Sequence, residues 1–155
     1  MKKFVALLLT LVLVLSLAAL PASAQSKGVI KLGGLAPLTG NYAEYGKGFQ
    51  IAWQMAIDEI NAAGGANGYL LEIDVKDSQG DTVVSSTMAT AFAEDDDIMA
   101  ILGDFTSGAC KANASIVDRY GVVQLSPTAS APDYAAMSPF CFSIMGRQDG
   151  EAPYL

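Results

Sequence analysis

The stretch Ile30–Ala62, which reads IKLGGLAPLTGNYAEYGKGFQIAWQMAIDEINA, decides the fold of this chain. Residues Val29–Ala36 are mostly apolar and predict a buried strand. A loop interrupted by proline, glycine and asparagine follows, and it carries Tyr42 and Tyr45. The loop leads into an amphipathic helix. A strand, a loop long enough to line a ligand site and a helix, in this order, are typical of the start of an α/β domain.

A helix is predicted over Gly48–Ala62 because apolar side chains recur there at steps of three and four residues. This stripe consists of Phe49, Ala52, Trp53, Ala56 and Ile60. The pair Gly64-Gly65 follows and is typical of the glycine cap that ends a helix. Both ends of the first strand–helix unit are therefore indicated.

The remainder of the chain repeats the alternation of strand and helix. Strands are predicted at residues 70–76, 98–102, 122–125 and 140–145, and helices at residues 82–93, 107–120 and from Gln148 onward. The cluster DSQGD at residues 77–81 predicts a turn that supplies a helix cap. Ile98–Leu102 is wholly apolar, which is typical of a parallel strand covered on both faces. We expect one α/β domain over residues 25–155, an open parallel sheet with helices on both faces.

Three polar segments each follow a predicted strand directly: Pro37–Gly46, Gly103–Gly108 and Ser126–Pro132. Each is rich in glycine, hydroxyl side chains or tyrosine. Open parallel sheets bind ligands at the carboxyl ends of their strands, where such segments converge. The sequence therefore predicts a site for a small polar ligand at this edge of the sheet.

The segment Gly103–Gly108 leads into the predicted third helix. Backbone N–H groups in the first turn, from Thr106 to Gly108, and the helix dipole favour an anion there, and the Ser107 hydroxyl adds a donor for a carboxylate. Thr106 or Ser107 is equally typical of a residue that only caps a helix. The residues alone leave ligand contact and cap open.

The other two segments also have two interpretations. The carbonyl of Thr128 and the hydroxyl of Ser130 are suited to accept protons from an ammonium group, or they belong to an ordinary turn set by the neighbouring prolines. Tyr42 and Tyr45 are suited to line a pocket for an aliphatic side chain or to offer a phenol, or they are surface tyrosines.

The first residues have the pattern of an export signal. Lys2 and Lys3 precede the apolar run Phe4–Leu20, and Ala22-Ser23-Ala24 fits the cleavage rule, so residues 1–24 are predicted to be a cleavable signal peptide. The alternative is an uncleaved anchor helix, since about 17 apolar residues is the low end of what spans a bilayer. No cysteine lies near the cleavage site, so no lipoprotein anchor is expected. The mature chain is expected in the periplasm or outside the cell.

The charge and the missing residue types exclude several functions. The formal net charge is −7, which argues against nucleic-acid binding because that needs a basic surface. The sequence has no histidine, which removes the usual general base and the commonest zinc ligand. Cys110 and Cys141 form one disulfide or stay buried as small apolar residues, and both alternatives remain open. No metal or cofactor is expected.

No enzyme motif is present. Gly33-Gly34 followed by Gly40 does not reproduce the dinucleotide spacing G-x-G-x-x-G, and neither a phosphate-loop lysine pattern nor G-x-S-x-G occurs. We therefore expect a binding protein and not an enzyme.

At these residues the chain closely resembles the amino-terminal part of the exported solute-binding proteins of branched-chain amino acid ABC transporters. The resemblance covers residues 29–155 and is carried by IKLG at 30–33, PLTG at 37–40, AIDEIN at 56–61, ILG at 101–103 and SPTASAP at 126–132. It implies the first lobe of a type I, two-lobed venus-flytrap fold. It also implies an amino acid ligand and transporter permease subunits as partners.

The resemblance assigns roles to four residues of this sequence. Ser107 matches the serine that holds the ligand carboxylate together with backbone N–H groups. Ser130 matches a hydroxyl that contacts the head group, and Thr128 a position that contributes backbone. Tyr45 matches an aromatic residue on the first-lobe side of the cleft.

The chain also departs from the family pattern. Asp104 stands where members vary widely, Gly108 stands where a second hydroxyl is frequent, and the two cysteines do not match the family disulfide. The resemblance implies that the chain ends before the first lobe is complete and that the acidic residue that pairs with the ligand ammonium comes from the second lobe. We expect the amino-terminal part of an amino acid receptor for an ABC importer. The alternatives are a sensory or amide- or urea-type receptor domain and a truncated fragment without binding activity.

Overall fold

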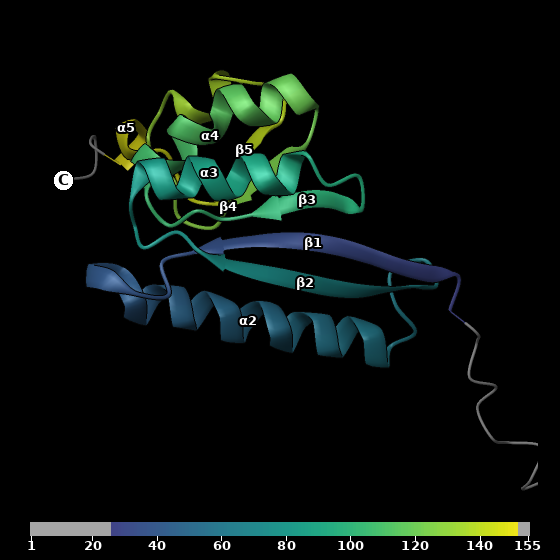
Figure 1. Ribbon diagram of the computed structural model, residues 1–155. Coiled ribbons are helices and arrows are strands. Elements are labelled where there is room, and N and C mark those ends of the chain that lie inside the picture. The colour runs from purple at the N-terminus through teal and green to yellow at the C-terminus, as the bar shows by residue number, and fades with distance from the viewer. Residues whose placement is uncertain (1–25, 152–155) are drawn as a thin grey trace, which may run out of the picture.

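A five-stranded parallel sheet forms the centre of the computed structural model, which describes residues 26–151 (Figure 1). The predicted signal peptide lies outside the described residues. The strands are β1 (Gly28–Ala36), β2 (Tyr69–Asp77), β3 (Ile98–Leu102), β4 (Val123–Ser126) and β5 (Cys141–Ser143). The helices are α2 (Ala43–Ala62), α3 (Thr82–Ala93), α4 (Ser107–Tyr120) and α5 (Gln148–Glu151), with short 3-10 turns η1 (Gly40–Tyr42) and η2 (Tyr134–Ala136).

The strand order is β2-β1-β3-β4-β5, and every pair is parallel. The chain leaves β1 toward β2 and later returns to the other side of β1 to form β3. The order therefore reverses between β1 and β3, which is the topological switch point where open α/β sheets bind ligands. The predicted open parallel sheet is confirmed.

Helices cover both faces of β1. In Figure 1, α2 lies below β1 and β2, whereas α3 and α4 lie on the other side. Two adjacent glycines of β1 allow a helix to approach each face closely. A Cβ on Gly33 would lie 2.7 Å from the Phe92 ring of α3, and a Cβ on Gly34 would lie 3.0 Å from the Trp53 ring of α2. Because successive strand residues point to opposite faces, this glycine pair admits one aromatic ring on each side.

The main core lies between the sheet and the α3–α4 layer. Its buried members are Leu35, Ala89, Phe92, Ile98, Ile101, Cys110, Ala114, Val117, Ala129, Tyr134 and Cys141. Every strand except β2 and β4 contributes to this list. Fully burying one large aliphatic or aromatic side chain of this kind stabilises the fold by about 1.5–3 kcal/mol.

Helix α2 differs from the prediction in two ways. It begins at Ala43 and not at Gly48, so Tyr45 lies in its first turn and only Tyr42, in η1, precedes it. The predicted stripe is also partly wrong, because Ala52 and Ala56 are exposed and Ile57 is the buried residue.

One side chain bonds the carboxyl end of α2 to β2. The Asn61 side chain donates to the carbonyl of Leu71 at 2.9 Å and accepts from its N–H at 2.8 Å. These two bonds tie the end of the helix to β2. Of the apolar side chains that recur every four residues along α2, Phe49 and Trp53 are half-buried and Ile57 is buried. Ile60, one of the predicted contacts, is 37% exposed.

The other elements agree closely with the predictions. Helices α3 and α4 and strand β3 have the predicted limits, and Asp81 caps α3 by accepting from the N–H groups of Val83 and Val84. The expectation that β3 is covered on both faces is only partly met. Ile98 and Ile101 of this strand are buried, whereas Met99 is 61% exposed.

No helix among residues 26–151 is long and apolar enough to cross a membrane.

Two glycines of α2 provide a matched test of this packing. A Cβ on Gly46 would lie 2.1 Å from the carbonyl oxygen of Pro37, whereas nothing lies within 4 Å of one on Gly48. We expect Gly46→Ala to lower the free energy of unfolding by about 1–3 kcal/mol. Gly48→Ala should raise it by up to about 1 kcal/mol because alanine favours a helix. Urea unfolding of both variants checks the prediction, and equal effects would contradict it.

Candidate functional site

The loop after β1 is held by one carboxylate. Asp77, at the end of β2, lies beside Ala36, the last residue of β1. Its oxygens accept hydrogen bonds from Leu38 N at 2.8 Å, Thr39 N at 3.2 Å, the Thr39 hydroxyl at 2.6 Å and Gln79 N at 2.8 Å. Burial pushes the pKa of Asp77 upward, but these hydrogen bonds outweigh it and hold the pKa below its usual value.

The segment Gly103–Phe105, which follows β3, is hydrogen-bonded to β4 and the residues after it. Gly103 N donates to Leu125 O at 2.9 Å, Gln124 Nε2 to Gly103 O at 2.8 Å, Ser126 Oγ to Asp104 O at 2.9 Å and Thr128 Oγ1 to Phe105 O at 2.6 Å. Hydrogen bonds at each of these three residues thereby connect two of the predicted segments, Gly103–Gly108 and Ser126–Pro132, with the end of β4.

The side chain of Asp104 is fully buried beside this segment. Its Oδ1 accepts from the Ser78 hydroxyl at 3.0 Å and from Phe105 N at 2.5 Å. Its Oδ2 has no hydrogen-bond partner within the described part of the chain. Asp104 thus connects the loop after β2 to the loop after β3.

The structure brings Ser107 and Ser130 together. Ser107 is the first residue of α4, and its Oγ accepts hydrogen bonds from Ser130 N at 3.1 Å and Ala131 N at 3.2 Å. Because the oxygen accepts both bonds, the hydroxyl proton remains available for another acceptor.

Thr106 caps the helix, and Ser107 does not. The Thr106 hydroxyl accepts from Ala109 N at 3.1 Å, so the cap alternative holds for Thr106. Among residues 26–151, the N–H groups of Ser107 and Gly108 have no hydrogen-bond partner. Both point out of the first turn of a helix, where the dipole favours negative charge.

Acceptors lie on the other side of this contact. The Thr128 hydroxyl is used by Phe105, but its carbonyl accepts no hydrogen bond from the described residues. The Ser130 hydroxyl likewise has no partner among them, while its carbonyl accepts from Gln148 N at 3.0 Å. Donors from α4 and acceptors from the segment after β4 therefore meet at one edge of the sheet.

Aromatic rings from two loops meet beside these groups. Phe105 stacks on Tyr45 with a centroid distance of 4.7 Å and an interplanar angle of 20°, and Tyr42 lies 5.0 Å from the same ring. Tyr45 is 58% exposed and Tyr42 40%. The segment after β1 thus reaches the segment after β3 through aromatic contacts, and all three predicted segments converge.

The arrangement suits a ligand that carries both an acid and an amine. Ser107 N, Gly108 N and the Ser107 hydroxyl are donors for a carboxylate. Thr128 O and Ser130 Oγ are acceptors for an ammonium group. Exposed aromatic rings lie next to both sets. These features are those of a binding site.

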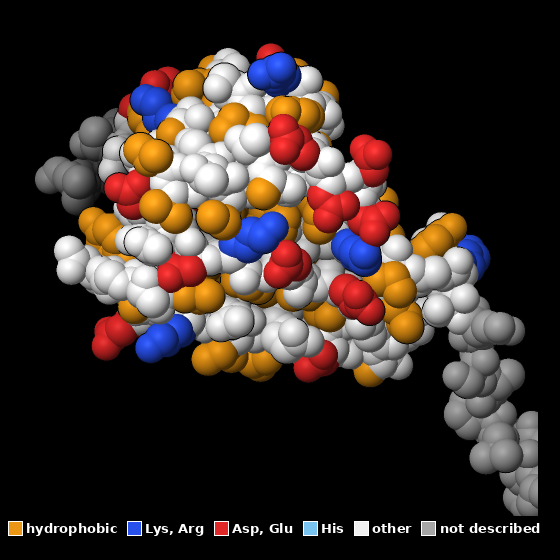
Figure 2. All heavy atoms as spheres, in the orientation of Figure 1, with side chains coloured by type: hydrophobic (Ala, Val, Ile, Leu, Met, Phe, Trp, Pro, Cys, Tyr) orange, Lys and Arg blue, Asp and Glu red, His pale blue; other side chains and the backbone are white. Residues whose placement is uncertain are grey.

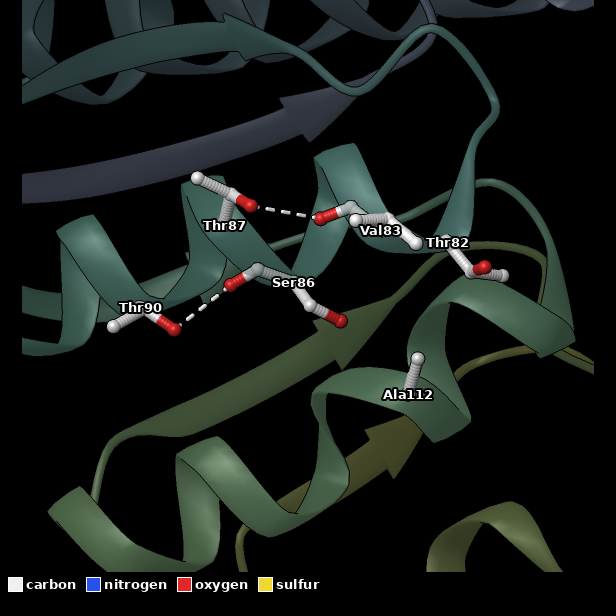
Figure 3. Close-up of a pocket in the computed structure, with 6 residues that line it drawn as sticks. All are labelled: Thr82, Val83, Ser86, Thr87, Thr90 and Ala112. Carbon is white, nitrogen blue, oxygen red and sulfur yellow. Dashed lines mark hydrogen bonds between the residues drawn. The ribbon is translucent and has the colours of Figure 1, made fainter.

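An open hollow of about 360 Å³ along α3 is a less suitable site. Figure 3 shows its lining of Thr82, Val83, Ser86, Thr87, Thr90 and Ala112. The hydroxyls of Thr87 and Thr90 donate to carbonyls one turn earlier, and that of Ser86 to Asn113. With those hydroxyls already engaged, we assign no ligand to this hollow.

The surface in Figure 2 carries acidic and basic side chains interspersed with one another and no continuous basic patch. Within the described residues, no group of three or more potential ligands is placed to hold a metal ion.

The two cysteines are free thiols buried in the core. Cys110 donates to the carbonyl of Asp104 at 3.3 Å, and burial raises its pKa to about 12. Burial also raises the pKa of Cys141. Of the two alternatives left open by the sequence, the structure shows buried cysteines without a disulfide.

Comparisons with known proteins identify the family of the chain. The sequence pattern of the periplasmic binding protein family matches residues 29–154. A Leu/Ile/Val-binding protein of Rhizobium johnstonii is 35% identical over 125 residues, which are 81% of this chain and 33% of the relative.

Solved structures give the same result. The branched-chain amino acid transporter substrate-binding protein LivJ from Streptococcus pneumoniae, in complex with isoleucine, superposes with a TM-score of 0.73 at 31% identity, covering 77% of this chain and 34% of that one. An ABC transporter substrate-binding protein from Desulfitobacterium hafniense, in complex with Leu, also has a TM-score of 0.73, at 28% identity over 81% of this chain and 37% of that one.

The fold is that of an α/β ligand-binding domain with its candidate site at the switch point of the sheet. The chain belongs to the periplasmic binding protein family. It spans about a third of the length of the curated relatives that it matches first.

Sequence reasoning missed three residues that shape this site: Asp77, Asp104 and Phe105. The sequence predicts Asp77 only as part of a turn, because the strand register that places it beside Ala36 cannot be derived from the sequence. Asp104 and Phe105 lie inside a predicted segment, but Ser78, which bonds Asp104, and Tyr45, which stacks on Phe105, lie 26 and 60 residues earlier in the chain. Only a correct strand order would have pointed to them.

The role of Asp77 predicts a pH-dependent stability. Because its pKa is lower in the folded protein, its stabilisation is complete above the unfolded pKa of about 3.9 and is lost as the pH falls through the folded pKa. Asp77→Asn should lower the free energy of unfolding at pH 7 by about 1–3 kcal/mol, with a smaller difference below pH 4. Urea titrations at both pH values check this. Asp74→Asn, on the exposed edge of the same strand, is the control and should change little.

The burial of the thiols predicts their reactivity. In the folded protein at pH 8, neither Cys110 nor Cys141 should react with iodoacetamide, because each is buried and its pKa is raised. After unfolding without reductant, mass spectrometry should find two adducts. The absence of adducts after unfolding would show a disulfide.

Proposed function

We propose that this chain is the ligand-binding first lobe of an extracytoplasmic solute-binding protein that serves an ABC importer. Its ligand is a branched-chain or related amino acid, bound through the carboxylate and ammonium groups. The observation that carries the proposal is the contact of the Ser107 hydroxyl with the N–H groups of Ser130 and Ala131. This contact sets free donors of α4 against free acceptors after β4.

Each predicted site residue has a part in this proposal. Ser107 and Gly108 bind the carboxylate, with Thr106 as the cap that orders their turn. Thr128, through its carbonyl, and Ser130, through its hydroxyl, bind the ammonium group. Tyr42 and Tyr45 contact the ligand side chain.

The wider setting rests on the relatives. Their names describe Leu/Ile/Val-binding proteins and substrate-binding proteins of ABC transporters. We accordingly propose residues 1–24 as a cleaved signal peptide, a location in the periplasm or outside the cell, and permease subunits as partners. The resemblance implies a second lobe, and we propose that it encloses the ligand after hinge closure; the relatives are about three times as long as the stretch that matches this chain.

Substitution of Ser107 tests the site. Ser107→Ala removes the hydroxyl donor, and we expect it to weaken amino acid binding about 10- to 100-fold, the range for a hydrogen bond to a charged group. Calorimetric titration with leucine, isoleucine, valine and phenylalanine measures this. Ser115→Ala, on an exposed position of the same helix, is the matched control and should bind like the wild type.

The titration uses the natural mature product, whose intact mass is determined first. Binding of none of these amino acids by the unaltered protein would overturn the proposed function. Equal affinities for the wild type and Ser107→Ala would overturn the assignment of the carboxylate site.

A further inference from the structure

Four aromatic rings gather beside the proposed head-group site. We call Tyr42, Tyr45, Phe49 and Phe105 the aromatic cluster. Phe105 is its centre, with ring centroids 5.0 Å from Tyr42, 4.7 Å from Tyr45 and 6.0 Å from Phe49. The other three rings come from η1 and α2, so the cluster bridges the two loops at the switch point of the sheet.

The aromatic cluster is held in place from several sides. The backbone of Phe105 accepts from the Thr128 hydroxyl at 2.6 Å and donates to Asp104 at 2.5 Å. Tyr42 lies against Gly80, where a Cβ would come within 2.7 Å of its ring. Rigid side chains lose little conformational freedom when a ligand binds, which favours affinity.

The cluster is nevertheless open to solvent. Tyr45 covers one face of Phe105 at an interplanar angle of 20°, while Tyr45 itself remains 58% exposed. Neither tyrosine hydroxyl has a hydrogen-bond partner in the described part of the chain. Aromatic rings prefer offset-stacked or edge-to-face neighbours at 4.5–7 Å, and such contacts add to affinity beyond the area they bury.

The cluster and the head-group site lie on one short segment. Phe105 is two residues before Ser107, and its carbonyl is bonded to Thr128, which offers the ammonium acceptor. A ligand held by its carboxylate at Ser107 and its ammonium group at Thr128 therefore extends its side chain next to these rings. An aliphatic ligand side chain would be stabilised there only by the apolar area that it buries, whereas an aromatic ligand side chain would also stack on the rings of the cluster.

We infer that the preferred ligand is an amino acid with an aromatic side chain, whose ring packs on the Tyr45–Phe105 pair. This inference rests on the proposed function and refines its ligand class. It differs from the aliphatic ligands that the relatives' names describe.

Calorimetric titration of the natural mature protein with L-phenylalanine and L-leucine tests the inference. We expect L-phenylalanine to bind about two- to tenfold more tightly, as the energy of one aromatic contact implies. Phe105→Leu should bring the ratio of the two dissociation constants close to one. Tyr69→Leu removes a partly exposed ring at the start of β2, at the opposite edge of the sheet and outside the cluster, and it should keep the ratio.

The outcomes separate this inference from the proposed function. Tighter binding of L-leucine by the wild type would overturn the inference and leave the proposed function standing. Binding of neither amino acid would overturn both. An unchanged ratio in a folded Phe105→Leu variant, as judged by its thermal unfolding, would also overturn the inference. If that variant does not fold, Tyr45→Leu, at an exposed position, replaces it with the same expected loss of preference.

Discussion

The candidate site depends on the hydrogen bonds that join Gly103–Phe105 to β4 and the residues after it. Strand β3 ends at Leu102 and α4 begins at Ser107, so this segment alone sets the direction in which α4 starts. Each of its three carbonyls accepts from a side chain of Gln124, Ser126 or Thr128. Because this backbone is held at every residue, Ser107 is already in contact with Ser130. Ligand binding therefore costs little further conformational entropy of this segment.

A second set of contacts brings the β1 loop to the same place. The Asp77 carboxylate holds Leu38 and Thr39, and the rings of Tyr42 and Tyr45 then rest on Phe105. These contacts are local in space but distant in the chain. The buried Asp104 has one oxygen without a partner among the described residues, and burying an unpaired polar atom costs free energy.

Most of the fold was predictable from the sequence. The limits of α3, α4 and β3 follow from sharp signals, namely the Asp81 cap, the apolar run at residues 98–102 and the glycine after Tyr120. The start of α2 was not predictable, because Gly46 and Gly48 are poor helix formers in isolation. Gly46 is helical because the backbone of Pro37 lies where a side chain would be.

The sequence by itself determined the class of fold, the three segments at the sheet edge and the residue types of the site. These properties are encoded locally, in apolar periodicity, glycines and hydroxyl side chains. Only the tertiary structure decided that Thr106 caps α4 while Ser107 bonds to Ser130, that Asp77 holds the first loop, and that Phe105 stacks on Tyr45. The physical reason is that most of these contacts link residues 23 to 60 positions apart in the sequence. The cap at Thr106 is local, but either of two adjacent hydroxyl side chains is suited to form it. Strand order and register bring such partners together, and neither is a local property of the chain.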